Sequence, residues 1–189
     1  MMQALECKLM DKVTIPEATK GPWRIERFKT DMPDFHSMLR GRGIPVGEEF
    51  TRLMRGDVLV MSDTPAEMLD HYDAVQRAKG SCLINGLGIG MVLKAVLKKH
   101  DVTDVTVVEL SQDVLDMVAP HYADERVTFI CASAFDYKPP KSKWYEMVWH
   151  DIWDYICADN LPEMHKLHRK YGRRSVWQGS WCRHECERH

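Results

Sequence analysis

The stretch Ser81-Cys-Leu-Ile-Asn-Gly-Leu-Gly-Ile-Gly90, followed by Glu109 at the end of the next apolar run, decides the fold of this chain. It predicts a buried strand, a glycine turn, a helix, a second strand and then an acid. Glycines allow a tight turn and a close approach of the backbone to a ligand. An acid about 20 residues further on suits the two hydroxyls of a ribose. This order of parts is typical of proteins that hold an adenosine-containing cofactor.

The spacing of the glycines distinguishes between two such cofactors. It reads Gly86-x-Gly88-x-Gly90, and Met91 stands where a dinucleotide-binding fingerprint has its third glycine. The spacing therefore favours S-adenosylmethionine over NAD. A plain strand–helix turn without a ligand is the alternative. The position of the glycines inside a strand–helix–strand pattern favours the cofactor.

From residue 81 onward, apolar strand-like runs alternate with helical patterns. Near-continuous apolar strands separated by helices indicate a parallel sheet covered on both faces, whose ligands bind at the carboxyl ends of the strands. We therefore expect an α/β fold, a doubly wound and mostly parallel Rossmann-like sheet. The expected strands are 82–85, 105–109, 127–131, 145–150 and 175–181, and the expected helices are 90–99, 111–119 and 159–171.

The first 62 residues are less regular and predict a small strand and loop appendage to a main domain of residues 63–189. Residues 23–28 are a candidate strand, and Arg55-Gly56-Asp57 is a plausible turn between strands 51–54 and 58–61. Glycines and prolines mark a long loop over 33–47, which suits a lid or an oligomerisation element.

A helix is predicted from Thr64 to about Ala78, at the start of the main domain. Thr64 as the N-cap and Glu67 would form a capping box. The side expected to be buried carries Met68, Leu69, Tyr72 and Val75.

Composition excludes several classes of protein. The chain has 189 residues, 44% of them hydrophobic, and a net charge of −2, so it exerts no general attraction on nucleic acid or anionic membrane. No apolar run approaches the roughly 20 residues of a membrane span, and the N-terminus lacks the apolar core of a signal peptide. We expect a cytoplasmic protein whose cysteines are free thiols.

Four motifs in order carry a family resemblance. They are the glycine loop Leu83–Gly90, the strand Val105-Thr-Val-Val-Glu109, the segment Cys131-Ala-Ser-Ala-Phe-Asp136, and Tyr145-Glu-Met-Val-Trp-His-Asp151. Through them residues 58–155 resemble the class I S-adenosylmethionine-dependent methyltransferases, and most of all their spermidine synthase-like branch. The resemblance implies a cofactor, S-adenosylmethionine or its decarboxylated form, and a transferase activity.

The same resemblance assigns roles to single residues. Asp151 matches the catalytic aspartate of the synthases. The residues implied in cofactor binding are Gly86, Leu87, Gly88 and Gly90 in the loop, Glu109 and Leu110 at the ribose, and Ser133 and Ala134 at the adenine.

The chain also departs from the family. Ile84 and Ile89 stand where one or the other branch has an acid, and Ser133 replaces the usual adenine-site acid. The final antiparallel strand pair of the family has no counterpart here. The fifth strand would then be a sheet edge, which a covering tail or a homo-oligomer would protect.

Asp151 can orient an amine or hydroxyl nucleophile or accept its proton. The alternative is an N-cap or a charged loop residue. Trp153 can hold a cation on its ring face or simply pack. His150 alternates with Asp151 along the strand and should point the other way.

The C-terminal segment suggests two further sites, neither of them favoured. Cys182, His184, Cys186 and His189 are zinc-ligand types, but their spacing is unlike a structural zinc site, so we assign no metal ligands. Residues 165–189 are basic, which suits a phosphate backbone or, as we prefer, a solvated helix face.

The sequence therefore favours an S-adenosylmethionine-dependent methyltransferase acting on an unknown acceptor. An aminopropyltransferase acting on a polyamine comes second. A non-catalytic binding module that kept the fold comes third.

Overall fold

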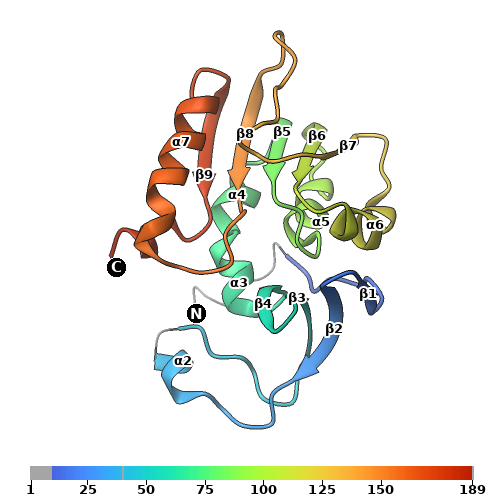
Figure 1. The fold of residues 1–189 in the computed structure, drawn as a ribbon, viewed down its shortest axis with the longest axis vertical. Helices are drawn as coiled ribbons and strands as arrows, with labels where there is room; N and C mark the ends of the chain where they lie inside the picture. The colour runs from blue at the N-terminus through green and yellow to red at the C-terminus, as the bar shows by residue number, and fades with distance from the viewer. Residues whose placement is uncertain (1–9, 40, 189) are drawn as a thin grey trace.

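The computed structural model describes residues 10–39 and 41–188, which form two sheets (Figure 1). The larger sheet has five parallel strands in the order β7-β6-β5-β8-β9. This strand order confirms the predicted doubly wound Rossmann-like sheet. Its strands are β5 (Gly80–Asn85), β6 (Val102–Glu109), β7 (Val127–Cys131), β8 (Tyr145–His150) and β9 (Ser175–Ser180).

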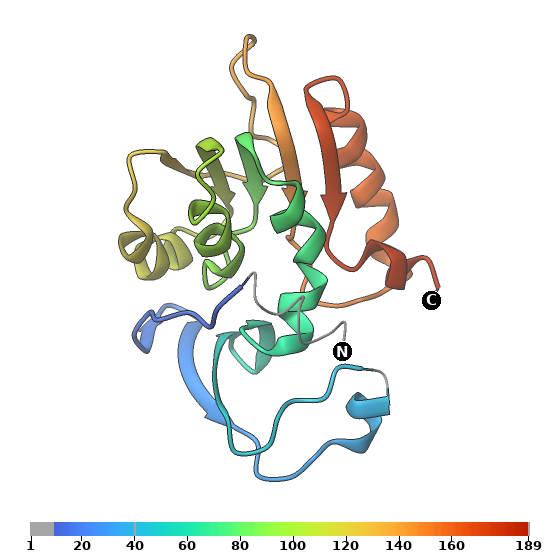
Figure 2. The ribbon, with the colours of Figure 1, turned by 180° about the vertical axis from the view of Figure 1, so that it is seen from behind.

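Helices cover both faces of this sheet. α4 (Tyr72–Arg77) and α5 (Met91–Leu97) lie on one face and α7 (Leu161–Tyr171) on the other, as Figures 1 and 2 show from opposite sides. α6 (Gln112–Val118) packs against β6 and β7, and Ser111 caps it by accepting from the backbone N–H of Val114. Short turns of helix complete the fold: α8 (Arg183–Cys186) and the 3-10 helices η2 (Ala119–Tyr122) and η3 (Ala158–Asn160).

The smaller sheet is an antiparallel meander in the order β1-β2-β3-β4. Its strands are β1 (Ala18–Lys20), β2 (Trp23–Lys29), β3 (Glu49–Arg55) and β4 (Val58–Ser62). The predicted strand at 23–28 and the hairpin around Gly56 are confirmed. The sheet ends at Ser62, and it lies beyond the carboxyl ends of the parallel strands (Figure 1). It can therefore cover whatever binds at those ends.

The loop predicted over 33–47 contains one turn of helix, α2 (Phe35–Leu39). Asp34 explains it, because its carboxylate accepts hydrogen bonds from the backbone N–H groups of His36 and Ser37. The rest of the loop is irregular, as expected.

The helix predicted from 64 to 78 is two helices, α3 (Pro65–Asp70) and α4, which meet at His71. The predicted capping box is wrong. The Thr64 hydroxyl pairs with the Ser62 hydroxyl at 3.0 Å and makes no cap bond. Met68 and Val75 are buried, but Leu69 is exposed.

The edge strand β9 is the last strand among the described residues. Val176 on this strand is exposed. Among the described residues, no helix is long and apolar enough to cross a membrane.

Candidate functional site

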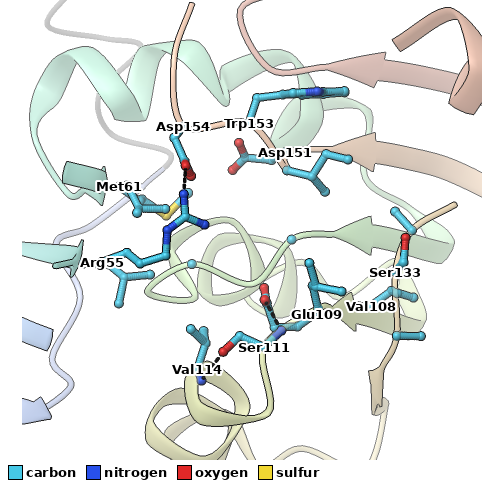
Figure 3. A pocket seen from close by; sticks show the side chains of 18 of the residues that line it. Arg55, Met61, Val108, Glu109, Ser111, Val114, Ser133, Asp151, Trp153 and Asp154 are labelled. Carbon is cyan, nitrogen blue, oxygen red and sulfur yellow. Dashed lines mark hydrogen bonds and ion pairs between the residues drawn. The ribbon is translucent and has the colours of Figure 1, made fainter. Parts of the chain in front are cut away.

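The candidate site lies where the chain order reverses between the neighbouring strands β5 and β8. Ligands of open α/β sheets bind in the crevice at such a point. A cavity of about 290 Å³ is found there. Figure 3 shows Arg55 and Met61 on one side of it, Ser133 on the other, and Asp151 facing Glu109 across it.

Most of the predicted site residues line this cavity together. They are Gly86, Gly88, Glu109, Leu110, Ser133, Ala134 and Asp151. The sequence separates them widely, and the carboxyl ends of β5, β6, β7 and β8 bring them together. Leu87 and Gly90 do not line the cavity but support its wall.

The glycine loop is shaped by close contacts that leave no room for side chains. Gly86 and Gly88 have φ of 97° and 53°, in the left-handed region. A Cβ on Gly86 would overlap the backbone carbonyl of Asp151, and one on Gly88 would overlap the Met61 side chain. The first glycine thus lets β5 and β8 approach each other, and the second lets β4 pack on the loop.

Gly90 has a different role, at the start of α5. Its φ is 77°, and an added Cβ would overlap the ring of Tyr122. The Tyr122 hydroxyl donates to the backbone carbonyl of Ile89 at 2.8 Å. Gly90 therefore makes room for a ring that holds the loop from outside the cavity.

The Glu109 carboxylate is fixed by the backbone around it. Oε2 accepts from the N–H of Leu87 at 2.9 Å, and Oε1 accepts from the N–H of Ser111 at 2.8 Å. Burial raises the pKa of Glu109, while these hydrogen bonds oppose the shift. Each carboxylate oxygen has a second lone pair, so both can still accept from a diol in the cavity.

The wall after β7 carries Ser133 and Ala134. The Ser133 oxygen accepts from the N–H of Phe135 at 3.1 Å, which leaves its hydroxyl proton to donate. Ala134 is buried, and its carbonyl accepts from the Tyr171 hydroxyl at 3.1 Å. This wall suits a flat apolar group with one polar edge.

Ile84 and Ile89, the positions that lack the family's acids, are core residues. Their side chains are buried, and neither lines the cavity. The loop therefore offers no carboxylate from either position.

Asp151 follows β8, and its N–H donates to the carbonyl of Asn85 at 2.8 Å. It does not cap a helix, because the next helical turn begins at Ala158. Burial, together with the charges of Asp70, Glu109 and Asp154, raises the pKa of Asp151 to about 8. A carboxyl with such a pKa can exchange a proton near neutral pH.

His150 points away from the cavity, as the strand alternation predicts, whereas Trp153 lies after the strand. His150 points to the α7 face, where its ring contacts those of His168 and Tyr171 at 5.5 Å, and Asn85 Nδ2 lies 2.9 Å from its Nδ1. Trp153 lines the cavity and donates its indole N–H to Glu163 at 2.8 Å. It is therefore both a packing residue and a cavity wall.

Several cavity residues escape sequence reasoning. Arg55 of β3 forms an ion pair with Asp154 across the mouth of the cavity, and its guanidinium lies 5.4 Å from the Trp23 ring centroid. Glu163 adds another acid. In the sequence Arg55 looks like part of a hairpin turn, and no local signal pairs it with a residue 99 positions away.

The described residues of the C-terminal segment have core and local contacts. No group of potential metal ligands is found among them, Cys182 and Cys186 are buried in the core, and His189 lies outside them. Basic side chains of the segment have local partners. Lys170 donates to the carbonyls of Ala134 and Phe135, and Arg183 pairs with Glu187 at 2.9 Å.

The fold and the site together define a Rossmann-like α/β protein with a ligand cavity at its topological switch point. No family model and no curated protein matches the sequence. Among solved structures, the N-methyltransferase NodS from Bradyrhizobium japonicum WM9 is 9% identical, with a TM-score of 0.49 over 60% of this chain and 65% of that one.

Two other solved structures are similar. A spermidine synthase from Thermotoga maritima is 15% identical, with a TM-score of 0.49 over 88% of this chain and 53% of that one. A putative methylase from Haemophilus influenzae is 20% identical, with a TM-score of 0.43 over 61% of this chain and 66% of that one. This chain thus spans less than two thirds of each neighbour. The fold assignment rests on the strand order above.

Proposed function

We propose that this chain is an S-adenosylmethionine-dependent transferase, and that it transfers a methyl group. The observation that supports this most is the arrangement of Glu109 and Asp151, two buried carboxyls that face one cavity from the ends of β6 and β8. Such an arrangement can hold a ribose on one side and an acceptor on the other.

The residues of the cavity fit this cofactor. Glu109 would accept from the ribose hydroxyls, Ser133 and Ala134 would border the adenine, and Gly86 and Gly88 would let the loop approach it. When bound, the cofactor supplies an electrophilic carbon on a sulfonium. Asp151 would orient the acceptor and, in its ionised form, take up the proton that the acceptor loses.

An aminopropyltransferase is the second candidate, and one observation favours it. A polyamine needs several spaced acids, and Asp154 and Glu163 line the same cavity as Asp151, with the Trp153 ring beside them. The sequence alone does not bring Glu163 to this place.

A non-catalytic binding module remains the third candidate, supported by the missing acids at Ile84, Ile89 and Ser133. We further propose that the first 62 residues act as a lid on the cavity, because five of them line it. They are Trp23, Leu53, Arg55, Val60 and Met61.

The test is calorimetric titration with S-adenosylmethionine, its decarboxylated form and S-adenosylhomocysteine. We expect micromolar binding that Glu109→Ala weakens at least about 10-fold, because the mutation removes acceptors worth about 1.5–3 kcal/mol. Glu125→Ala, an exposed acid that does not line this cavity, is the matched control. Preference for the decarboxylated form would favour aminopropyl transfer. Binding of none of the three would overturn both transferase proposals.

A further inference from the structure

His71 has an unusual environment between α3 and α4. Its side chain is 0% exposed, and no described residue forms a hydrogen bond with either ring nitrogen. Burying a polar group without a hydrogen bond costs free energy, so a polar side chain left in this state calls for a reason. A leucine in this place would fill the space without that cost.

The ring lies directly beside the candidate catalytic residue. Its Nε2 is 3.7 Å from Oδ2 of Asp151, slightly more than a hydrogen-bond length. The Trp149 ring holds the imidazole edge-on, with ring centroids 5.8 Å apart and planes at 79°. His71 thus lies behind Asp151, on the side that packs against α3 and α4, while the carboxyl also lines the cavity.

The contact between His71 and Asp151 is not an ion pair near pH 7. Burial, with the charge of Arg42, lowers the pKa of His71 to about 3, so its ring is neutral. Burial and neighbouring acids keep Asp151 largely protonated. A neutral imidazole beside a carboxyl has one N–H and one bare nitrogen, so it can donate or accept.

Other charged groups surround His71 and Asp151, and they come from several packed elements. Asp70 and Glu67 belong to α3, Glu109 to β6 and Asp154 to the loop after β8. Arg42, in the loop before β3, binds Asp70 through two hydrogen bonds of 2.8 and 2.7 Å. Burial raises the pKa of Glu67 to about 8 as well, so Glu67 needs its own control.

We propose that His71 is a positioning residue for Asp151, whose carboxyl it holds toward the cavity through a hydrogen bond at Nε2. The proposal rests on the proposed transferase function. When the carboxyl is protonated, its O–H donates to bare Nε2 and the ring proton is on Nδ1. When the pair loses one proton, from Nδ1, the carboxyl proton moves to Nε2, which then donates to the carboxylate. The ring stays neutral throughout, and only its tautomer changes.

The first experiment observes that tautomer. Protein labelled with ¹⁵N-histidine is titrated from pH 6 to 9.5, and long-range ¹⁵N–¹H spectra distinguish the two tautomers from the imidazolium. The signals of His71 among the nine histidines are assigned with His71→Gln. We expect a change from Nδ1–H to Nε2–H with a midpoint near pH 8, absent in Asp151→Asn and retained in Glu67→Gln. A constant tautomer, or a change that persists in Asp151→Asn, would overturn the proposal.

The second experiment measures the Asp151 carboxyl by ¹³C spectra in three proteins. His71→Leu removes every hydrogen bond of the ring, whereas the amide of His71→Gln can both donate and accept near the position of Nε2. Bonds to an ionised group are the stronger ones, so their loss should raise the pKa of Asp151 by about one unit in His71→Leu. We expect His71→Gln to keep the wild-type value. Equal values in all three proteins would contradict the proposal.

Neither experiment uses the cofactor or an acceptor. If the protein binds no S-adenosylmethionine, the proposed function fails while these spectra still decide whether the pair exists. If the cofactor binds but the spectra show no coupling, only the role of His71 is overturned. Should His71→Leu not fold, the tautomer titration of the wild-type protein and of Asp151→Asn remains decisive.

Discussion

Gly86 and Asp151 lie in backbone contact across the switch point of the sheet. A Cβ built on Gly86 would come within 2.8 Å of the Asp151 carbonyl carbon and overlap its oxygen. The N–H of Asp151 also donates to the carbonyl of Asn85, the residue before Gly86. The position of the candidate catalytic carboxyl therefore depends on the missing side chain of the first loop glycine.

Gly86→Ala should destabilise the protein far more than its backbone conformation alone explains. A left-handed conformation costs a residue with a Cβ about 1–2 kcal/mol. Here the overlap with Asp151 adds to that cost, and we expect a total above about 3 kcal/mol in urea unfolding. Gly47→Ala is the matched control, since Gly47 has φ of 77° and nothing within 4 Å of an added Cβ. Equal losses in the two variants would show that the contact does not matter.

Asp151→Asn should stabilise the protein, and more so at higher pH. The Asp151 carboxyl has a pKa of about 8 in the folded protein, against an ordinary value of 3.8 in the unfolded chain. Between these values the folded state holds more protons than the unfolded state, so the stability of the wild type falls as pH rises, by up to about 1.4 kcal/mol per pH unit. The stability of the wild type stops falling above pH 8, and below pH 4 it no longer changes through Asp151. Asparagine does not ionise, so the variant has no such pH dependence.

The measurement is the free energy of unfolding at pH 5, 6, 7 and 8. We expect the difference between Asp151→Asn and the wild type to widen along this series. Asp124→Asn is the control, because Arg126 lowers the pKa of Asp124 to about 2 and its protonation does not change with folding above pH 5. A difference for Asp151→Asn that stays constant would contradict the raised pKa.

The cysteines should differ strongly in their reaction with a thiol reagent at pH 8. Cys131 is exposed, whereas Cys82, Cys182 and Cys186 are buried, and burial raises the pKa of all three thiols. The thiolate is the reactive form, so Cys131 should be modified first and the buried thiols only on unfolding. A Cys7→Ser background removes a residue outside the described part of the chain. Fast labelling of Cys182 or Cys186 would show that the C-terminal segment opens, and zinc protection of them would revive the metal hypothesis.

The sequence predicts best what depends on local patterns. Strands 127–131 and 145–150 are found at the predicted residues, because each is a short and mostly apolar run. The glycine spacing and the acid at 109 likewise locate the cavity, since the carboxyl ends of parallel strands meet at one edge.

Features that depend on competing side-chain contacts or on contacts distant in the sequence are missed. The Thr64 cap fails because the Ser62 hydroxyl competes for its side chain. The break at His71 and the ion pair between Arg55 and Asp154 leave no periodic signal in the sequence. The ion pair joins residues 99 positions apart, and both of them line the candidate site.

Arg55→Met should change the rates of cofactor binding more than it changes stability. Arg55 and Asp154 are partly exposed, and such ion pairs contribute about 0–1 kcal/mol to folding. Their position differs from that of an ordinary surface pair, because both line the cavity and join the small sheet to the loop after β8 (Figure 3). If the small sheet acts as a lid, breaking the pair lets it open more often, so bound cofactor should leave faster.

Stopped-flow displacement of S-adenosylhomocysteine measures this rate. We expect dissociation to be about 5–10 times faster in Arg55→Met, as the loss of about 1 kcal/mol from a closed state implies. Arg24→Met is the matched control, since Arg24 pairs with Glu26 within β2 of the same sheet and does not line the cavity. Equal dissociation rates in the two variants would show that the ion pair between Arg55 and Asp154 does not hold a lid closed. Faster release in Arg55→Met alone, with unchanged unfolding, would mean that the contact holds the lid closed rather than the fold together.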